Sequence, residues 1–208
     1  METFSFIIKI MAQLFFEYGA MGSGKTIELL KVAHNYELQR KKVLLMTPSI
    51  DTRSGIGIIS SRLGLKRKAV SITKKEDLYK KILQNKKNYS VVLVDEAQFI
   101  EEPQVDQLAK IVDNLNIPVM AFGLRADAFT HLFPGSKRFF EIADKIQEVK
   151  TICAFCGKKA IATLRFNNGK PQYKGNQIFI GGNEAYLPVC RKHWKKPNLN
   201  MLNNIGKF

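Results

Sequence analysis

An eight-residue motif near the start of the chain constrains the fold more than any other feature. Residues 19–26 read GAMGSGKT and satisfy the pattern G-x-x-x-x-G-K-[ST]. A short apolar run at 13–18 precedes the motif and an amphipathic run at 25–39 follows it, which predicts a strand, a tight loop and a helix. Backbone N–H groups of such a loop can surround phosphate oxygens, so the sequence predicts a nucleoside triphosphate site.

The residues of this loop have separate expected roles. Lys25 is expected to reach the outer phosphates, and Thr26 to place its hydroxyl on Mg²⁺. The purely structural alternative is a glycine-rich turn that binds no ligand. The candidate phosphate-binding residues are Gly19, Ala20, Met21, Gly22, Ser23, Gly24, Lys25 and Thr26.

A second motif, VVLVDEAQF at 91–99, supplies two acids at the end of an apolar run. Asp95 is where an aspartate would hold Mg²⁺ through water. Glu96 could activate water in an ATPase, or it could take the proton of a substrate hydroxyl in a kinase. This motif alone does not separate the two classes.

The rest of the N-terminal portion alternates strands and helices, which predicts a parallel α/β sheet of the P-loop NTPase, RecA-like type with helices on both faces. The loop at 51–64 carries several glycines and serines, and we expect it to be a mobile lid. Further strands are expected at 42–49, 68–72, 91–95 and 117–122, with helices at 75–86 and 101–115.

The pattern changes near Val149 to paired cysteines, turns and short β segments. We therefore expect a small second domain after the α/β domain. The expected divisions are an extension at 1–11 that is disordered, an α/β domain at 12–149, a small domain at 150–197 and a tail at 198–208.

All three cysteines fall into two short spacings, Cys153-x-x-Cys156 and Cys190-x-x-His193. Three thiolates and one imidazole close a tetrahedral site and leave no open position, which is typical of structural zinc. The alternatives are buried free cysteines or a redox pair.

The high positive charge of the chain raises the question of whether it binds nucleic acid. The net charge is +15, but only eight of the 33 basic residues are arginines and the lysines are scattered in pairs. We expect a lysine-rich surface that attracts anionic small substrates, and no nucleic-acid partner. No apolar run reaches the roughly 18 residues of a membrane span, and so few cysteines favour a reducing cytoplasm over a disulfide framework.

The ordered set of motifs resembles bacterial thymidine kinases of the cytosolic, zinc-containing type over nearly all of residues 12–197. The matching motifs are GAMGSGKT, DTR at 51–53, DEAQF at 95–99, GL at 123–124, ADKI at 143–146, the two cysteine spacings and IGGNEAY at 180–186. The resemblance implies ATP-dependent phosphorylation of the 5′-hydroxyl of thymidine to give dTMP. It also implies a homotetramer that dTTP inhibits.

The resemblance also implies roles for individual residues. Glu96 matches the catalytic base, and Arg53 is a candidate to neutralise charge on the transferred phosphoryl group. Other nucleotide-site positions are Asp51, Ala97 and Gln98. The positions that match the nucleoside pocket are Met21, Phe99, Leu124, Phe133, Thr163, Gly181 and Tyr186.

Two further features complete the prediction. Zinc would join the ends of a lasso loop near 156 and 190, and Gly181-Gly182 would let the returning chain approach the substrate closely. Family members commonly carry an aromatic residue where this chain has Ala128, whereas here the phenylalanine is Phe129. Either the loop shifts by one position or another side chain covers the sugar.

Two further functions are compatible with parts of the sequence. One is a nucleic-acid-stimulated P-loop ATPase with a zinc ribbon, which only the net charge favours. The other is a non-catalytic zinc-ribbon protein that binds nucleotide as a switch. A nucleoside kinase is the hypothesis that accounts for all the motifs together.

Overall fold

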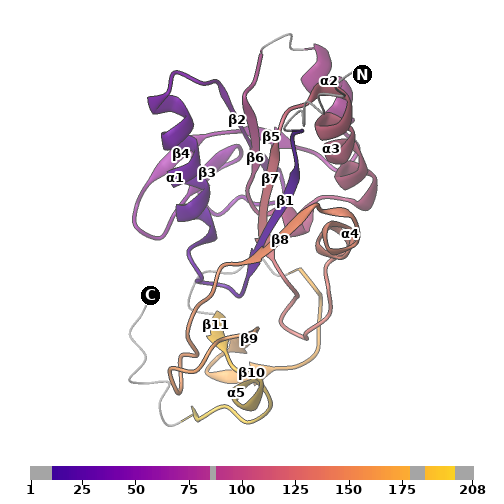
Figure 1. Cartoon of the computed structure of the whole chain (residues 1–208). Helices are drawn as coiled ribbons and strands as arrows, with labels where there is room; N and C mark the ends of the chain where they lie inside the picture. Colours follow the sequence, from indigo (N-terminus) through magenta and orange to yellow (C-terminus); the bar gives the residue numbers. More distant parts are fainter. Residues whose placement is uncertain (1–10, 85–87, 179–185, 200–208) are drawn as a thin grey trace, which may run out of the picture.

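The computed structural model describes residues 11–84, 88–178 and 186–199. Nearly all of the expected N-terminal extension, most of the expected tail and Gly181 lie outside these ranges. Within them the chain builds a six-stranded, fully parallel sheet (Figure 1) in the order β5-β2-β6-β7-β1-β8. Its strands are β1 (Leu14–Gly19), β2 (Val43–Pro48), β5 (Val70–Ile72), β6 (Val91–Val94), β7 (Val119–Leu124) and β8 (Lys145–Glu148).

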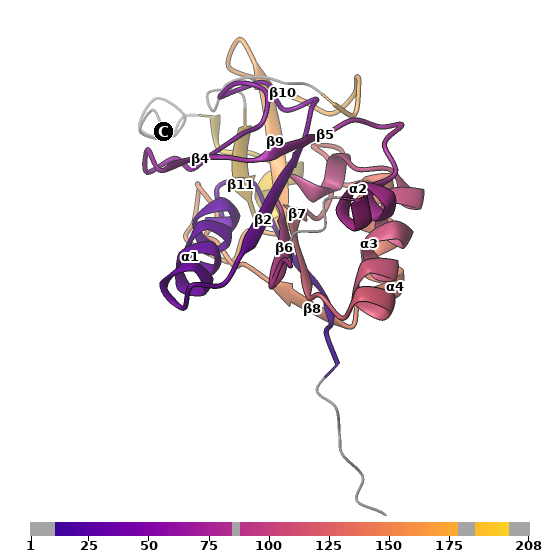
Figure 2. The same ribbon diagram turned by 90° about the horizontal axis from the view of Figure 1, so that it is seen from above.

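Helices cover both faces of this sheet (Figure 2), which confirms the predicted α/β architecture. Side chains of a strand alternate between its faces, so the uninterrupted apolar run of β6 serves two cores. Val92 and Val94 pack on the side of α3, while Val91 and Leu93 pack on the side of α1. Helix α1 spans Lys25–Leu38, and the opposite face carries α2 (Leu78–Gln84), α3 (Glu102–Leu115) and α4 (Pro134–Ile142).

The predicted loop at 51–64 is wrong over residues 58–60. These residues form β3 (Ile58–Ser60), which pairs antiparallel with β4 (Lys66–Lys68). Ile59 is buried in the core beneath α1, and an ion pair between Arg67 and Glu37 joins β4 to that helix. The glycines and serines of this segment suggested a loop, but the burial of Ile59 anchors a hairpin there.

Other boundaries differ by a few residues. Helix α2 begins at Leu78 rather than at 75, because Asp77 accepts a hydrogen bond from the backbone N–H of Lys80 and starts the turn. Residues 85–87 of the predicted helix lie outside the described ranges. The sequence interpretation assigned neither α4 nor β8.

The second part of the described chain is a small antiparallel sheet in the order β10-β9-β11, followed by α5 (Arg191–Lys195). Its strands are β9 (Ala162–Asn167), β10 (Lys170–Gln172) and β11 (Tyr186–Val189). Leu164, Phe166 and Val189 form a separate core together with Cys153 and Cys190. This separate core supports a division near residue 150, which stays a prediction. In the described ranges every helix is too short or too polar to cross a bilayer.

Candidate active site

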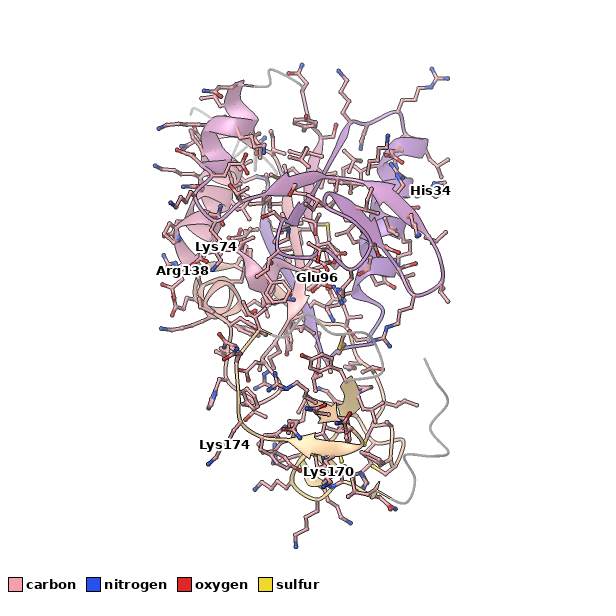
Figure 3. The ribbon with its side chains drawn as sticks, turned by 180° about the vertical axis from the view of Figure 1, so that it is seen from behind. His34, Lys74, Glu96, Arg138, Lys170 and Lys174 are labelled. Carbon is pink, nitrogen blue, oxygen red and sulfur yellow. The ribbon has the colours of Figure 1, made fainter. Side chains whose placement is uncertain are left out.

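A cavity of about 1360 Å³ lies between the two sheets. Its walls include Met21, Gly22 and residues 24–26 of the phosphate loop, residues that follow β2 and β6, residues 151–157, and residues of β9 and β11. The carboxyl edge of a parallel sheet is where open α/β folds bind ligands. Figure 3 shows Glu96 toward the end of the large sheet that is nearest to the small sheet.

The loop at 19–26 is held in shape by its own lysine. The Lys25 ammonium donates to the carbonyl of Ala20 at 2.9 Å and to the Ser23 hydroxyl at 3.3 Å. Gly24 begins α1 with φ 88°, a left-handed conformation that costs glycine no steric strain. Burial in the loop lowers the pKa of Lys25 to about 8, against the opposing pull of Glu96 and Asp95. The loop therefore holds a poorly solvated cation.

Thr26 and Asp95 meet at the base of this loop. The Thr26 hydroxyl lies 3.1 Å from Oδ2 of Asp95, which is buried. Burial and the neighbouring charge of Glu96 raise the pKa of Asp95 above its ordinary value. A hydroxyl and a carboxylate so close together beside a phosphate loop are oxygen donors that suit Mg²⁺, so these residues fit the predicted ion.

Glu96 is held at the opening of the cavity by two partners. It occupies a left-handed backbone conformation with φ 49° and ψ 38°, immediately before the short helix η1 (Ala97–Phe99). Its carboxylate accepts from Arg53 Nη2 at 2.7 Å and from Gln98 Nε2 at 2.6 Å. Gln98 in turn accepts from the backbone N–H of Leu124 at 2.9 Å. This chain of contacts fixes the carboxylate relative to β7.

Arg53 links two carboxylates from different segments. Its Nε and Nη2 lie 2.7 and 3.0 Å from the two oxygens of Asp51, and Nη2 also reaches Glu96. The charge of Glu96 and then the hydrogen bond to Asp51 raise the pKa of Arg53 beyond its already high value. Arg53 is therefore a fixed positive charge beside Glu96.

The predicted nucleoside residues line the other half of the cavity where they are described. Met21, Phe99, Leu124, Phe133, Thr163 and Tyr186 all border it. The rings of Phe99 and Phe133 meet edge to face with centroids 5.6 Å apart. The Met21 N–H donates to the Thr163 hydroxyl at 3.2 Å, which joins the phosphate loop directly to β9. Gly181 lies outside the described residues.

Two predicted nucleotide-site residues have a different position. Ala97 and Gln98 are buried, and neither is among the described residues that border the cavity. A Cβ added to Gly123 would come within 3.1 Å of Oε1 of Gln98, so β7 and η1 pack tightly here. Gln98 therefore supports Glu96 rather than facing a ligand.

The structure explains the displacement of the aromatic residue at 128–129. Asp127 accepts backbone hydrogen bonds from Phe129 at 2.8 Å and from His131 at 2.9 Å, which defines a tight turn. Ala128 is buried, borders the cavity and accepts a 2.9 Å hydrogen bond from Trp194 Nε1 through its carbonyl. The ring of Phe129 instead lies under the guanidinium of Arg165, whose Cζ is 4.8 Å from the ring centroid. The loop therefore turns Phe129 toward the small sheet.

Sequence reasoning missed Arg62, which lies on the turn between β3 and β4. Its guanidinium packs against Gly22, where an added Cβ would lie 3.1 Å from Nη1. Burial and the nearby charge of Arg53 lower the pKa of Arg62. Within the described ranges this guanidinium makes no hydrogen bond or ion pair. The sequence shows this arginine two residues before Gly64, in a short turn. The sequence analysis treated it only as part of the predicted loop.

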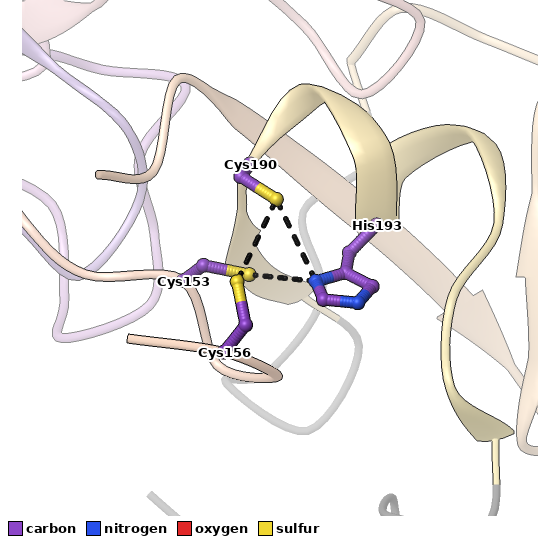
Figure 4. A group of neighbouring side chains, drawn as sticks. All are labelled: Cys153, Cys156, Cys190 and His193. Carbon is purple, nitrogen blue, oxygen red and sulfur yellow. Dashed lines mark hydrogen bonds between the residues drawn. The ribbon is translucent and has the colours of Figure 1, made fainter. Parts of the chain in front are cut away.

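The four predicted metal ligands converge at one point in the small part (Figure 4). The ligand atoms of Cys153, Cys156, Cys190 and His193 all lie within 4.8 Å of one another. The Cys156 and Cys190 sulfurs are 3.8 Å apart, and His193 Nδ1 is 3.4 Å from Cys153 Sγ. A tetrahedral zinc with bonds of about 2.3 Å to sulfur and about 2.0 Å to nitrogen would separate its ligands by about 3.5–3.8 Å. The separations of 3.4 and 3.8 Å are close to these values, so the cluster fits zinc with small side-chain adjustments of the wider pairs.

Comparisons with known proteins agree with this geometry. The family model described as thymidine kinase matches residues 12–194. A thymidine kinase of Streptococcus pyogenes serotype M3 is 55% identical over 189 residues, covering 91% of this chain and all of that protein. A thymidine kinase of Lactobacillus acidophilus is 54% identical over 197 residues, covering 91% of this chain and 99% of that protein.

One solved structure is similar only in part. The Pif1 helicase of Candida albicans is 20% identical with a TM-score of 0.40, covering 71% of this chain and 38% of the helicase chain. A likeness this low carries no argument about function. The family model and the two kinases confirm the resemblance found in the sequence: the chain belongs to the thymidine kinase family.

Proposed function

We propose that this chain transfers the γ-phosphoryl group of ATP to the 5′-hydroxyl of thymidine. The observation that carries the proposal is the position of Glu96 in the cavity. Phosphate-loop residues border the same cavity as the aromatic residues Phe99, Phe133 and Tyr186, and Glu96 lies among them. A base beside both halves can take the proton of the acceptor oxygen as that oxygen attacks phosphorus.

The phosphate half would hold the triphosphate by its backbone N–H groups and by Lys25. Mg²⁺, held from the side of Thr26 and Asp95, would offset charge on the phosphate oxygens. Arg53 is already held beside Glu96 by an ion pair. Its charge can therefore stabilise the transferred phosphoryl group without reorganisation of the side chain. Arg62 adds a further cation over Gly22, and we assign it to the same oxygens.

The reaction then proceeds in one balanced exchange. The Glu96 carboxylate accepts the proton of the thymidine 5′-hydroxyl, and the 5′-oxygen forms a bond to the γ-phosphorus. The bond between that phosphorus and the ADP oxygen breaks, and ADP leaves with the electron pair. The products are dTMP and ADP.

The nucleoside half would select the base by shape. The nearly perpendicular rings of Phe99 and Phe133 form an apolar corner for thymine, with Tyr186 and Thr163 contributed by the small sheet. We propose that zinc is structural here, because four ligands leave no open coordination position. Thiolate ligands require reduced cysteines, which supports a cytoplasmic enzyme.

Family membership also supports two properties of the whole enzyme, the homotetramer and its inhibition by dTTP. Light scattering of the purified protein tests the first. Initial rates with increasing dTTP at fixed ATP and thymidine test the second. A monomer, or rates that are indifferent to dTTP, would refute the respective property.

One assay tests the proposed activity. ADP formation is followed with ATP and Mg²⁺ plus thymidine, deoxycytidine, DNA or no acceptor. We expect turnover that depends on thymidine and yields dTMP. ATP consumption with DNA or with water alone would instead support a P-loop ATPase, and nucleotide binding without turnover would support a nucleotide switch.

A further inference from the structure

Arg165 is a buried arginine that the chemistry above does not use. It lies in the central strand of the small sheet and is 8% exposed. A buried guanidinium is rare unless its donors are satisfied, since its desolvation is costly. The contacts of Arg165 therefore indicate which segments of the chain it stabilises.

The first contact is with the chain that follows β10. Arg165 Nη1 donates to the carbonyl of Asn176 at 3.0 Å, and Nη2 donates to the carbonyl of Lys174 at 3.2 Å. Gly175, between them, has φ 131°, and a Cβ added there would lie 2.7 Å from Nη2. The guanidinium is thus inserted into a bend that only glycine fits.

The second and third contacts reach the candidate nucleoside pocket. Tyr186 is the cross-strand neighbour of Arg165, and their side chains are hydrogen bonded. Phe129, from the loop that follows β7, lies under the guanidinium in a cation–π contact. One side chain therefore joins three segments that are remote in sequence.

Arg165 also lies on a different side-chain row from the metal cluster. Residues of β9 alternate, so Thr163 and Arg165 share one row while Leu164 and Phe166 share the other. The second row packs with Cys153 and Cys190, and the first row includes Thr163, which bonds the phosphate loop. The contacts of Arg165 are therefore additional to those of the metal ligands.

We propose that Arg165 is a positioning residue that fixes Tyr186 and the bend at 174–176 against the nucleoside pocket. The inference rests on the proposed function, because Tyr186 is a thymidine contact only in a thymidine kinase. The proposal means that the geometry of the pocket depends on two sets of contacts, those of the metal cluster and those of Arg165. The metal cluster packs against the row of Leu164 and Phe166, and Arg165 holds the row of Thr163, which borders the pocket.

The test is the effect of Arg165→Met on the two substrates separately. The KM for thymidine should rise about tenfold or more, because hydrogen bonds to a buried charged group are lost, while the KM for ATP stays within about twofold. Arg165→Lys should recover only part of the loss, since an ammonium cannot reproduce the planar fork. Lys170→Met, an exposed lysine of β10 labelled in Figure 3, is the matched control and should change neither constant.

A second variant tests the same contact from the backbone. Gly175→Ala places a methyl group 2.7 Å from Nη2, which is too close, so it should also raise the thymidine KM. The double variant should be no worse than the more affected single variant, because both remove one arrangement. Additive effects, or an unchanged thymidine KM in Arg165→Met with normal zinc content, would overturn the proposal. A wild-type protein without thymidine-dependent turnover would instead overturn the proposed function.

Discussion

The phosphate half and the nucleoside half of the cavity are built in different ways. The phosphate half is drawn from short contiguous runs, 19–26, 51–53 and 95–96, each following a strand of one parallel sheet. The nucleoside half combines Phe99 and Phe133 of the large part with Thr163 and Tyr186 of the small sheet. The residues that carry the chemistry are therefore positioned by one sheet, whereas those that recognise the nucleoside depend on the contacts between two sheets.

The largest expected effect separates chemistry from binding. Glu96→Gln keeps the size of the side chain but removes the base, so turnover should fall about 10²–10⁴-fold. Steady-state kinetics and equilibrium binding are both measured, and the affinities for ATP and thymidine should stay near wild type. Glu102→Gln, on the exposed start of α3, is the control. Near-normal turnover in Glu96→Gln would assign the base to another residue.

A smaller effect is expected at Arg62, which is on the phosphate side. Arg62→Met should lower kcat/KM for ATP by about tenfold through the loss of a charge-assisted contact, with thymidine affinity unchanged. Arg67→Met is the matched control from the same hairpin, because Arg67 pairs with Glu37 and faces α1. Equal losses in the two variants would show that the hairpin acts only through its stability.

The pH dependence of ATP affinity should report on Lys25. Burial lowers the pKa of Lys25 to about 8, and a bound triphosphate must raise it. Below about pH 8 the ammonium is charged in both states, so Lys25 contributes no pH dependence to the affinity. Above that pH, binding takes up a proton, and affinity should fall by up to about tenfold per pH unit.

Calorimetric titration of ATP across this range provides the measurement. Lys25→Met should bind ATP more weakly and should lose this dependence, because no ammonium is left to titrate. Thymidine affinity should not follow the same curve, since Lys25 belongs to the phosphate half. A parallel fall in thymidine affinity would mean that the two halves are coupled more tightly than their construction indicates.

The smallest expected effect concerns one hydrogen bond between the large sheet region and the small sheet region. Trp194→Phe keeps an aromatic ring but removes the hydrogen bond from Nε1 to the carbonyl of Ala128. The free energy of unfolding should fall by about 0.5–1.5 kcal/mol, which denaturant titration can resolve. Unchanged stability would show that water replaces the indole N–H without loss.

Sequence reasoning succeeded where the signal was local. The strand, loop and helix around 19–26 were predicted because a fixed spacing of glycines, Lys25 and Thr26 is required for that geometry. The ligand cluster was predicted because two short spacings use every cysteine in the chain. Both patterns are visible within a few residues.

The most consequential misses involve contacts between distant residues. The hairpin at 58–68 depends on Ile59 reaching the core under α1, which no local periodicity reveals. The shift from Ala128 to Phe129 depends on Trp194 and Arg165, both from the small part. Arg165 itself sits in an ordinary strand sequence, and its role appears only when residues 129, 174–176 and 186 are brought together.

The central claim is that the two halves are separable and that the metal supports only the nucleoside half. Cys190→Ser tests it most directly, by measuring zinc content together with separate equilibrium affinities for thymidine and ATP. We expect zinc to be lost and thymidine binding to weaken, because the core around Leu164 and Val189 loosens, while ATP binding stays near wild type. Saturating thymidine should recover part of the rate, since Glu96 remains in place. A zinc-free protein with unchanged thymidine affinity, or one that loses both affinities equally, would contradict this account.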